Sequence, residues 1–153
     1  MASGLKFFMK FLRISNVFLS MAFLLSCGPA ASPSNLGIED GWVRAMPPGM
    51  KMTAAYGIIN NQGSDSVEIV SFSSDSFATV SLHRSLIVNG VTKMEPLPLL
   101  KLDGGAVTVL KPGGLHLMLE NPIGEISPGH RIGLTLKTAS GETFQFSIPV
   151  EAR

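Results

Sequence analysis

Residues 79–97 read TVSLHRSLIVNGVTKMEPL and carry the clearest structural signal in the chain. Two runs rich in Val, Ile, Leu and Thr flank Asn89-Gly90, a dipeptide that favours a two-residue type I′ turn between antiparallel strands. The stretch therefore predicts a β-hairpin with one strand at 79–88 and the other at 91–97.

The rest of the chain from residue 38 onward has the same character. Short runs of β-branched and large apolar residues alternate with Gly, Pro, Asn and Asp, and no amphipathic helical pattern appears. Further strands are predicted at 38–46, 53–60, 67–73, 106–111, 115–120, 131–138 and 143–150. Nine short strands with regular turns favour an all-β sandwich of two sheets. We expect its large aromatic residues to be buried or half-buried: Trp42, Tyr56, Phe72, Phe77, Phe144 and Phe146.

Residues 1–27 resemble a bacterial lipoprotein signal peptide. Basic residues precede an apolar stretch at 17–25, which is shorter than the roughly 20 residues that a membrane-spanning helix needs. It ends in Leu24-Leu25-Ser26-Cys27, similar to the lipobox at which a cysteine is lipidated and the chain is cut before it. An ordinary signal peptide with an incidental cysteine is the alternative. We expect Cys27 to be the lipid anchor, 28–36 a flexible tether and 37–153 a single domain.

Charge and cysteine content narrow the range of partners. Three of the 12 basic residues precede Cys27 and all 11 acidic residues follow it, so the remaining chain has a net charge of −2. No basic patch is evident, which argues against nucleic acid as a partner. Cys27 is the only cysteine, so the domain is expected to have neither a disulfide nor a thiolate metal site.

The predicted hairpin places a histidine near a methionine. With Asn89-Gly90 as the turn, Ser85 lies opposite Met94 and His83 lies opposite Pro96. His83 and Met94 are then diagonal neighbours on one face of the hairpin, about 7–8 Å apart at the backbone. Both side chains are long enough to reach a shared ion.

The predicted strand at 115–120 carries a second pair of the same types. His116 and Met118 are two residues apart and share one face, whereas the leucines that alternate with them face the core. On the residues alone, surface histidines and core-filling methionines explain both pairs about as well as a metal site does.

If the four residues bind a metal, their chemistry favours copper. Thioether sulfur is soft and uncharged, so it prefers Cu(I) over Mg²⁺ or Ca²⁺ and is a poor ligand for Zn²⁺. Two thioethers and two imidazoles leave the ion with its full positive charge, which favours Cu(I) over Cu(II). Thioethers form no disulfides, so such a site suits an oxidising compartment.

The spacing of these residues resembles the signature of the periplasmic copper chaperone family PCuAC. His83, Met94, His116 and Met118 form the pattern His-x10-Met-x21-His-x-Met. Flanking motifs also match, and the resemblance covers essentially the whole predicted domain: Trp42-Val43-Arg44, Ala54-Ala55-Tyr56, Asn60-Asn61, Leu82-His83, Gly90-Val91, Lys111-Pro112-Gly113-Gly114 and His116-Leu117-Met118-Leu119.

The resemblance implies a cupredoxin-like Greek-key β-sandwich that binds one Cu(I) per chain through His83, Met94, His116 and Met118. It implies a carrier, not an enzyme, in the periplasm or on the outer side of the cytoplasmic membrane. The copper would pass to an oxidase subunit, such as the binuclear copper site of cytochrome c oxidase, or to another copper chaperone. We expect a monomer. Some relatives carry a His- and Met-rich tail that binds Cu(II), and we expect no such second site after residues 151–153.

Three further methionines and one further histidine have simpler explanations than metal binding. Met46, Met50 and Met52 precede the second predicted strand, where loop or core methionines explain them best and an auxiliary copper-receiving lip is the alternative. His130 lies in a Pro-Gly turn and is expected at the surface.

A blue-copper electron carrier would need a Cys thiolate, which the predicted domain lacks. No nucleophile–base or acid–base motif supports an enzyme. The remaining alternative is a lipid-anchored envelope protein with copper storage, copper acquisition or a purely structural role.

Overall fold

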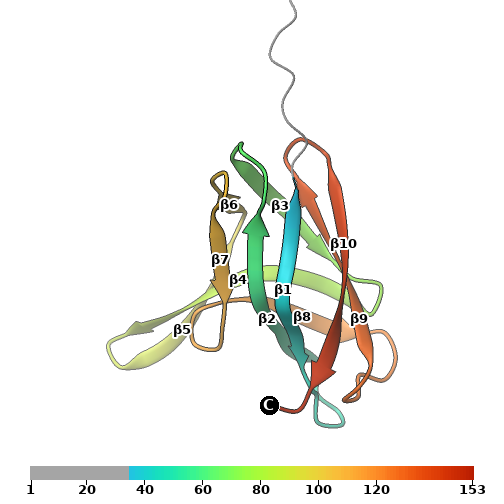
Figure 1. The fold of residues 1–153 in the computed structure, drawn as a ribbon. Coiled ribbons are helices and arrows are strands. Elements are labelled where there is room, and N and C mark those ends of the chain that lie inside the picture. Colours follow the sequence, from blue (N-terminus) through green and yellow to red (C-terminus); the bar gives the residue numbers. More distant parts are fainter. Residues whose placement is uncertain (1–34) are drawn as a thin grey trace, which may run out of the picture. The chain divides into compact units, whose positions relative to one another are not determined.

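The computed structural model describes residues 35–153. The predicted signal peptide, its Cys27 and nearly all of the predicted tether lie outside the described residues. The described part contains no helix that is long and apolar enough to cross a membrane. Its ten strands follow one another along the chain (Figure 1): β1 (Leu36–Arg44), β2 (Met52–Asn61), β3 (Val67–Ser73), β4 (Phe77–Val88), β5 (Val91–Leu97), β6 (Leu100–Leu102), β7 (Val107–Leu110), β8 (Leu115–Pro122), β9 (Arg131–Thr138) and β10 (Thr143–Glu151).

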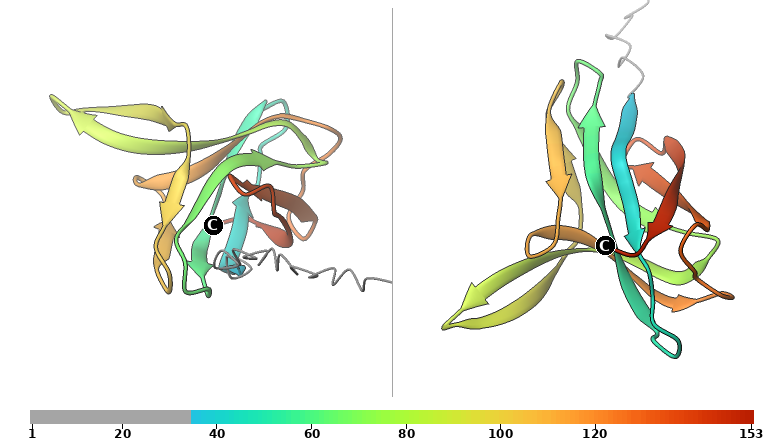
Figure 2. Two further views of the ribbon diagram at one scale, coloured as in Figure 1. Left: turned by 90° about the horizontal axis from the view of Figure 1, so that it is seen from above. Right: turned by 60° about the horizontal axis from the view of Figure 1, so that its bottom comes forward.

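Seven of the strands pair into a closed ring in the order β4-β8-β2-β1-β10-β9-β3, and pairing of β3 with β4 closes it. The β1–β10 pair is parallel and the other pairs in the ring are antiparallel. The all-β prediction is confirmed. The two sheets of the predicted sandwich are joined here into one barrel of mixed parallel and antiparallel strands. The three remaining strands pair with parts of ring strands: β5 with β4, β6 with β3 and β7 with β2. The β4–β5 hairpin projects from the ring (Figure 2).

The predicted hairpin register is confirmed. Val88 pairs with Val91 and Ser85 with Met94. Asn89 and Gly90 have φ values of 53° and 77°, the positive angles that a type I′ turn requires at both central residues.

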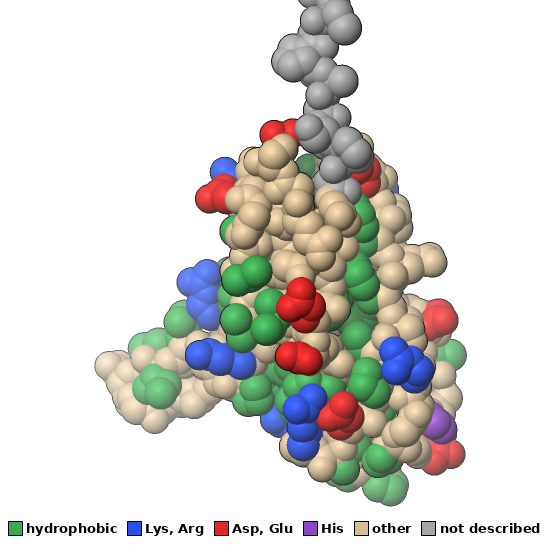
Figure 3. Space-filling view, viewed as in Figure 1, with side chains coloured by type: hydrophobic (Ala, Val, Ile, Leu, Met, Phe, Trp, Pro, Cys, Tyr) green, Lys and Arg blue, Asp and Glu red, His purple; other side chains and the backbone are tan. Residues whose placement is uncertain are grey.

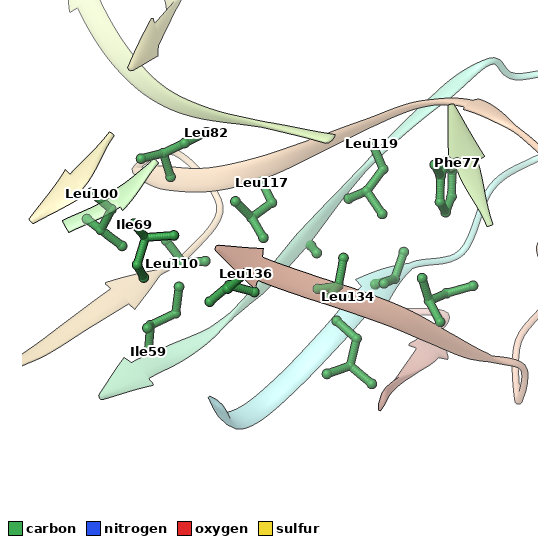
Figure 4. Packing of buried hydrophobic residues seen from close by; sticks show 14 of the residues in the cluster. Ile59, Ile69, Phe77, Leu82, Leu100, Leu110, Leu117, Leu119, Leu134 and Leu136 are labelled. Atoms are coloured by element: carbon green, nitrogen blue, oxygen red, sulfur yellow. The ribbon is translucent and has the colours of Figure 1, made fainter. Parts of the chain in front are cut away.

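The barrel core consists mainly of leucine, isoleucine and valine. Leu117 and Leu119 of β8 point toward Leu134 and Leu136 of β9, and Leu82 of β4 joins the same cluster (Figure 4). All five side chains are at most 2% exposed. Side chains alternate between the two faces of a strand. The residues next to Leu82 on β4 and next to Leu117 on β8 therefore face the outside of the ring.

A β-bulge in β1 changes the register of β1 against β2. The register shifts between Glu39 and Trp42, and a Cβ on Gly57 would lie 2.8 Å from the Cα of Gly41, so the two strands approach closely here. Beyond the bulge, Trp42 pairs with Tyr56 and their ring centroids are 4.7 Å apart.

The sequence predictions missed one strand. β6 is only three residues long, and it is held by pairing with β3 and by burial of Leu100 and Leu102. The six aromatic residues are buried or half-buried as predicted, and His130 is exposed. Acidic and basic side chains are interspersed on the face shown in Figure 3, with no large area of one sign.

Candidate metal centre

The four predicted ligands lie on one outer face formed by β5, β4 and β8. His83 of β4 pairs directly with His116 of β8, and Met118 lies opposite Ser81. Met94 of β5 lies opposite Ser85, diagonally across from His83. These positions alternate with the leucines of the barrel core, so all four side chains share the face that the leucines leave free.

A cavity of about 410 Å³ opens on this face. Met94, His116 and Met118 contribute to its lining, together with Tyr56 of β2 and the segment that joins β1 to β2. We refer to it as the outer cavity, because it lies outside the barrel core. His83 is beside it, with its ring centroid 5.9 Å from that of His116.

His116 is held in a defined orientation and almost completely covered. Its side chain is 3% exposed, and the Tyr56 ring lies 6.4 Å away between centroids. The Nδ1 atom is 3.0 Å from the carbonyl oxygen of Gly114, to which a protonated Nδ1 donates. In the neutral tautomer with this bond, the lone pair is on Nε2, and Nε2 is buried without a hydrogen-bond partner. A carbonyl that fixes the opposite ring nitrogen is the usual support for a metal-binding histidine.

His83 has the complementary arrangement. Its Nε2 is 3.0 Å from the hydroxyl oxygen of Ser81, and its Nδ1 is buried without a partner. In the tautomer whose Nε2–H donates to that hydroxyl, Nδ1 carries a free lone pair. Burial lowers the pKa of His83 below its usual 6.5, and the nearby His116 lowers the pKa further, whereas the charge of Glu120 opposes both effects. The site therefore favours the neutral, metal-binding form of His83.

The two thioethers differ in exposure. Met118 is half-buried on β8, while Met94 is 57% exposed on β5 at the edge of the sheet. Both are neutral side chains, and the carboxylate that acts on the pKa of His83 is that of Glu120. The described residues contain no group of three or more His, Cys, Asp and Glu side chains that could hold a metal. A metal bound here would depend on the thioethers.

These residues fit a Cu(I) ion. Among buried side-chain nitrogen and oxygen atoms of residues 35–153, only three lack a hydrogen-bond partner, and two of them are His83 Nδ1 and His116 Nε2. Leaving a buried polar atom unpaired costs free energy, so such atoms need an explanation. An imidazole nitrogen binds a first-row metal at about 2.0–2.1 Å, which lets rings about 5–6 Å apart share one ion. Thioethers from the adjoining strands complete a soft, neutral ligand set.

Comparison with known proteins agrees with the fold and the lipoprotein prediction. Residues 36–150 match the family described as "LpqE-like: Putative lipoprotein LpqE-like". The chain belongs to the LpqE-like family. It is 30% identical over 124 residues to "Putative lipoprotein Lxx21020" of Leifsonia xyli subsp. xyli, an alignment that covers 80% of this chain and 74% of the relative.

Solved structures similar to this LpqE-like chain include PCuAC domains. The copper-bound PCuAC domain from PmoF2 superposes with a TM-score of 0.63 at 19% identity, covering 80% of this chain and 100% of that domain. The solution structure of CuI-DR1885 from Deinococcus radiodurans gives a TM-score of 0.61 at 24% identity, covering 83% and 84%. The LpqE-like chain therefore has the PCuAC fold.

Sequence reasoning missed part of the surroundings of the site in this LpqE-like chain. It did not assign the Gly114 carbonyl, the Ser81 hydroxyl or the Tyr56 ring to the two histidines. Ser81 could have been found, because it lies two residues from His83 on the same face of the predicted strand. The Gly114 and Tyr56 contacts depend on a turn geometry and a strand pairing that the sequence does not specify.

Proposed function

We propose that this LpqE-like protein is an extracytoplasmic Cu(I) chaperone that binds one copper ion through His83, Met94, His116 and Met118. The observation that carries the proposal is the pair of buried, unpartnered imidazole nitrogens on the face that also presents two thioethers. A structural histidine pair would be expected to satisfy both ring nitrogens with protein hydrogen bonds.

Three further features support a carrier. The ligands come from three adjacent strands, whose ladder hydrogen bonds hold the metal geometry in place before copper arrives. The site lies in a cavity that is open to one side, with one ligand largely exposed. The PCuAC fold is shared with a domain whose structure contains copper, and its cupredoxin-like Greek-key description is part of the proposal for this chain.

The proposed cellular role follows from the family and the predicted lipobox. Lipidation of Cys27 would hold the domain at the outer side of the cytoplasmic membrane or in the periplasm, and the family description as lipoproteins agrees with this. We place the protein, as a monomer without catalytic activity, upstream of respiratory oxidase copper centres such as the binuclear site of cytochrome c oxidase. The acceptor would be the oxidase subunit itself or another copper chaperone.

The test is anaerobic Cu(I) titration of the lipidated chain in detergent, followed by mixing with a copper-binding oxidase fragment. One equivalent should bind, X-ray absorption should show both sulfur and nitrogen neighbours, and copper should move to the fragment. His116→Ala should weaken binding strongly, whereas the matched variant His130→Ala alters an exposed histidine outside the outer cavity and should bind as the parent does. Absence of sulfur neighbours would eliminate the site, and retention of copper in the presence of the fragment would contradict the delivery role.

A further inference from the structure

The methionines of the described chain are unusually distributed. Residues 35–153 contain five of them, and all five line the outer cavity: Met46, Met50, Met52, Met94 and Met118. None belongs to the buried core cluster, and only Met46 packs against it from outside. Methionines used for core filling would lie among the leucines and isoleucines of the barrel. Core packing therefore does not explain Met50 and Met52, although Met50 does lie in the loop between β1 and β2.

Strand register brings one of these residues next to a proposed ligand. Ala54 of β2 lies opposite Met118 of β8, and Met52 lies opposite Glu120. Met52 and Met118 are consequently diagonal neighbours on one face, with backbones about 7–8 Å apart, within reach of long side chains. Met52 thus extends the row of soft side chains from the proposed copper ligands to the rim of the cavity.

The segment between β1 and β2 presents the other two methionines from an ordered turn. Pro47 accepts a hydrogen bond from the amide of Met50 at 3.2 Å, and Gly49 has a φ of 84°, as the third position of a type II turn requires. Both ends of the segment are fixed: Ala45 donates to Glu151 at 2.8 Å, and Asn121 donates to Lys51 at 2.7 Å. This anchored turn leaves Met50 52% exposed beside Met52, which is 50% exposed.

Single exposed apolar side chains are common on protein surfaces, but Met46, Met50 and Met52 all line one cavity. Leucine would fill the same volume, yet both exposed positions and the half-buried Met46 carry thioethers. Three thioethers form a neutral, soft ligand set that selects Cu(I) over the hard cations. Without an imidazole, such a site binds independently of pH. The carboxylate of Glu120 lies opposite Met52 in the β-ladder, and the guanidinium of Arg44 also contributes to the cavity lining.

We propose that Met46, Met50 and Met52 form an outer Cu(I) site at the mouth of the outer cavity, where copper binds before it reaches the His/Met site. The proposal rests on the copper function argued above. Transfer inward is a ligand exchange: copper–sulfur bonds at the outer site break as bonds to Met118 and the histidines form. The ion remains Cu(I), and the thioethers neither gain nor lose a proton.

The experiment uses the lipidated chain in detergent with ¹³C-labelled methionine methyl groups, titrated anaerobically with Cu(I) and followed by NMR. Each signal is assigned by the Met→Leu variant that removes it. The first equivalent should shift the methyl signals of Met94 and Met118, and further copper should shift those of Met46, Met50 and Met52 together until they saturate. In the double variant Met50→Leu/Met52→Leu, the later response of Met46 should be lost while Met94 and Met118 still respond.

Leu99→Met serves as the matched control, because it adds an exposed thioether away from the outer cavity. Its methyl signal should stay unshifted over the range in which the outer methionines respond, and an equal shift would overturn the proposal as non-specific thioether binding. If Met94 and Met118 respond but the outer three do not, the outer site is refuted and the inner site stands. If Met94 and Met118 do not respond, the proposed function itself fails.

Discussion

Cu(I) affinity is expected to depend on pH in a way that reports the two histidines separately from the two methionines. Protons compete with copper for imidazole nitrogen, whereas thioethers do not titrate in this range. Burial and the neighbouring His116 lower the pKa of His83. Protons therefore begin to compete with copper at His83 only at a pH below its usual pKa of 6.5. Affinity should be nearly constant above about pH 7.5 and fall below about pH 6.5. Once protons compete for both imidazoles, each fall of one pH unit should weaken Cu(I) binding by up to about 100-fold, or about 2.7 kcal/mol.

Competition titrations against a Cu(I) chelator of known pH dependence measure this slope. His83→Ala should reduce it to at most about tenfold per pH unit, because only His116 then exchanges a proton for copper. Met94→Leu should weaken binding at every pH and keep the steep slope. An affinity that stays flat from pH 8 to pH 5 would show that the histidines are not ligands.

Three other predictions concern stability and anchoring. Leu117→Ala removes a core side chain that is 1% exposed and should lower the free energy of unfolding by about 2–5 kcal/mol in urea titrations, with a result near zero contradicting the core assignment. The copper-free protein should lose stability as pH falls through about 6.5, because the lowered pKa of His83 means that the unfolded chain binds more protons than the folded one. Thermal unfolding should show this loss, and His83→Gln should reduce it. Cys27→Ser should abolish lipid attachment, so identical partitioning of variant and parent into detergent would refute the lipobox.

The parts of the site governed by local rules were predictable from sequence. Asn89-Gly90 accommodates positive φ at both positions, so it fixes the turn and thereby the Ser85–Met94 pairing. Strand alternation likewise separates His116 and Met118 from the core leucines. These two rules place each His/Met pair on one face without any knowledge of the tertiary structure.

The pairing between those strands was not predictable in this way. The direct His83–His116 contact depends on the register of β4 against β8, which are joined by a long connection and not by a tight turn. The parallel β1–β10 pair of the ring is equally non-local. Alternation also gives only the direction of His116, not its burial, which arises because Tyr56 and the surrounding cavity wall cover that part of the outer face.

The graded exposure of the four proposed ligands bears on how copper would leave. All four would be neutral when bound, so no ligand charge would hold the ion, and the carboxylate that acts on His83 is that of Glu120. Met94 lies on an edge strand with more than half of its surface exposed, whereas His116 is almost fully covered. In the proposed function, an acceptor ligand would therefore replace the Met94 thioether first, without proton transfer or strand movement, and the histidines would release the ion afterwards. If the four residues bind Cu(I) as proposed, their soft ligands would select copper and the exposed side would allow exchange, which would favour handover above permanent storage.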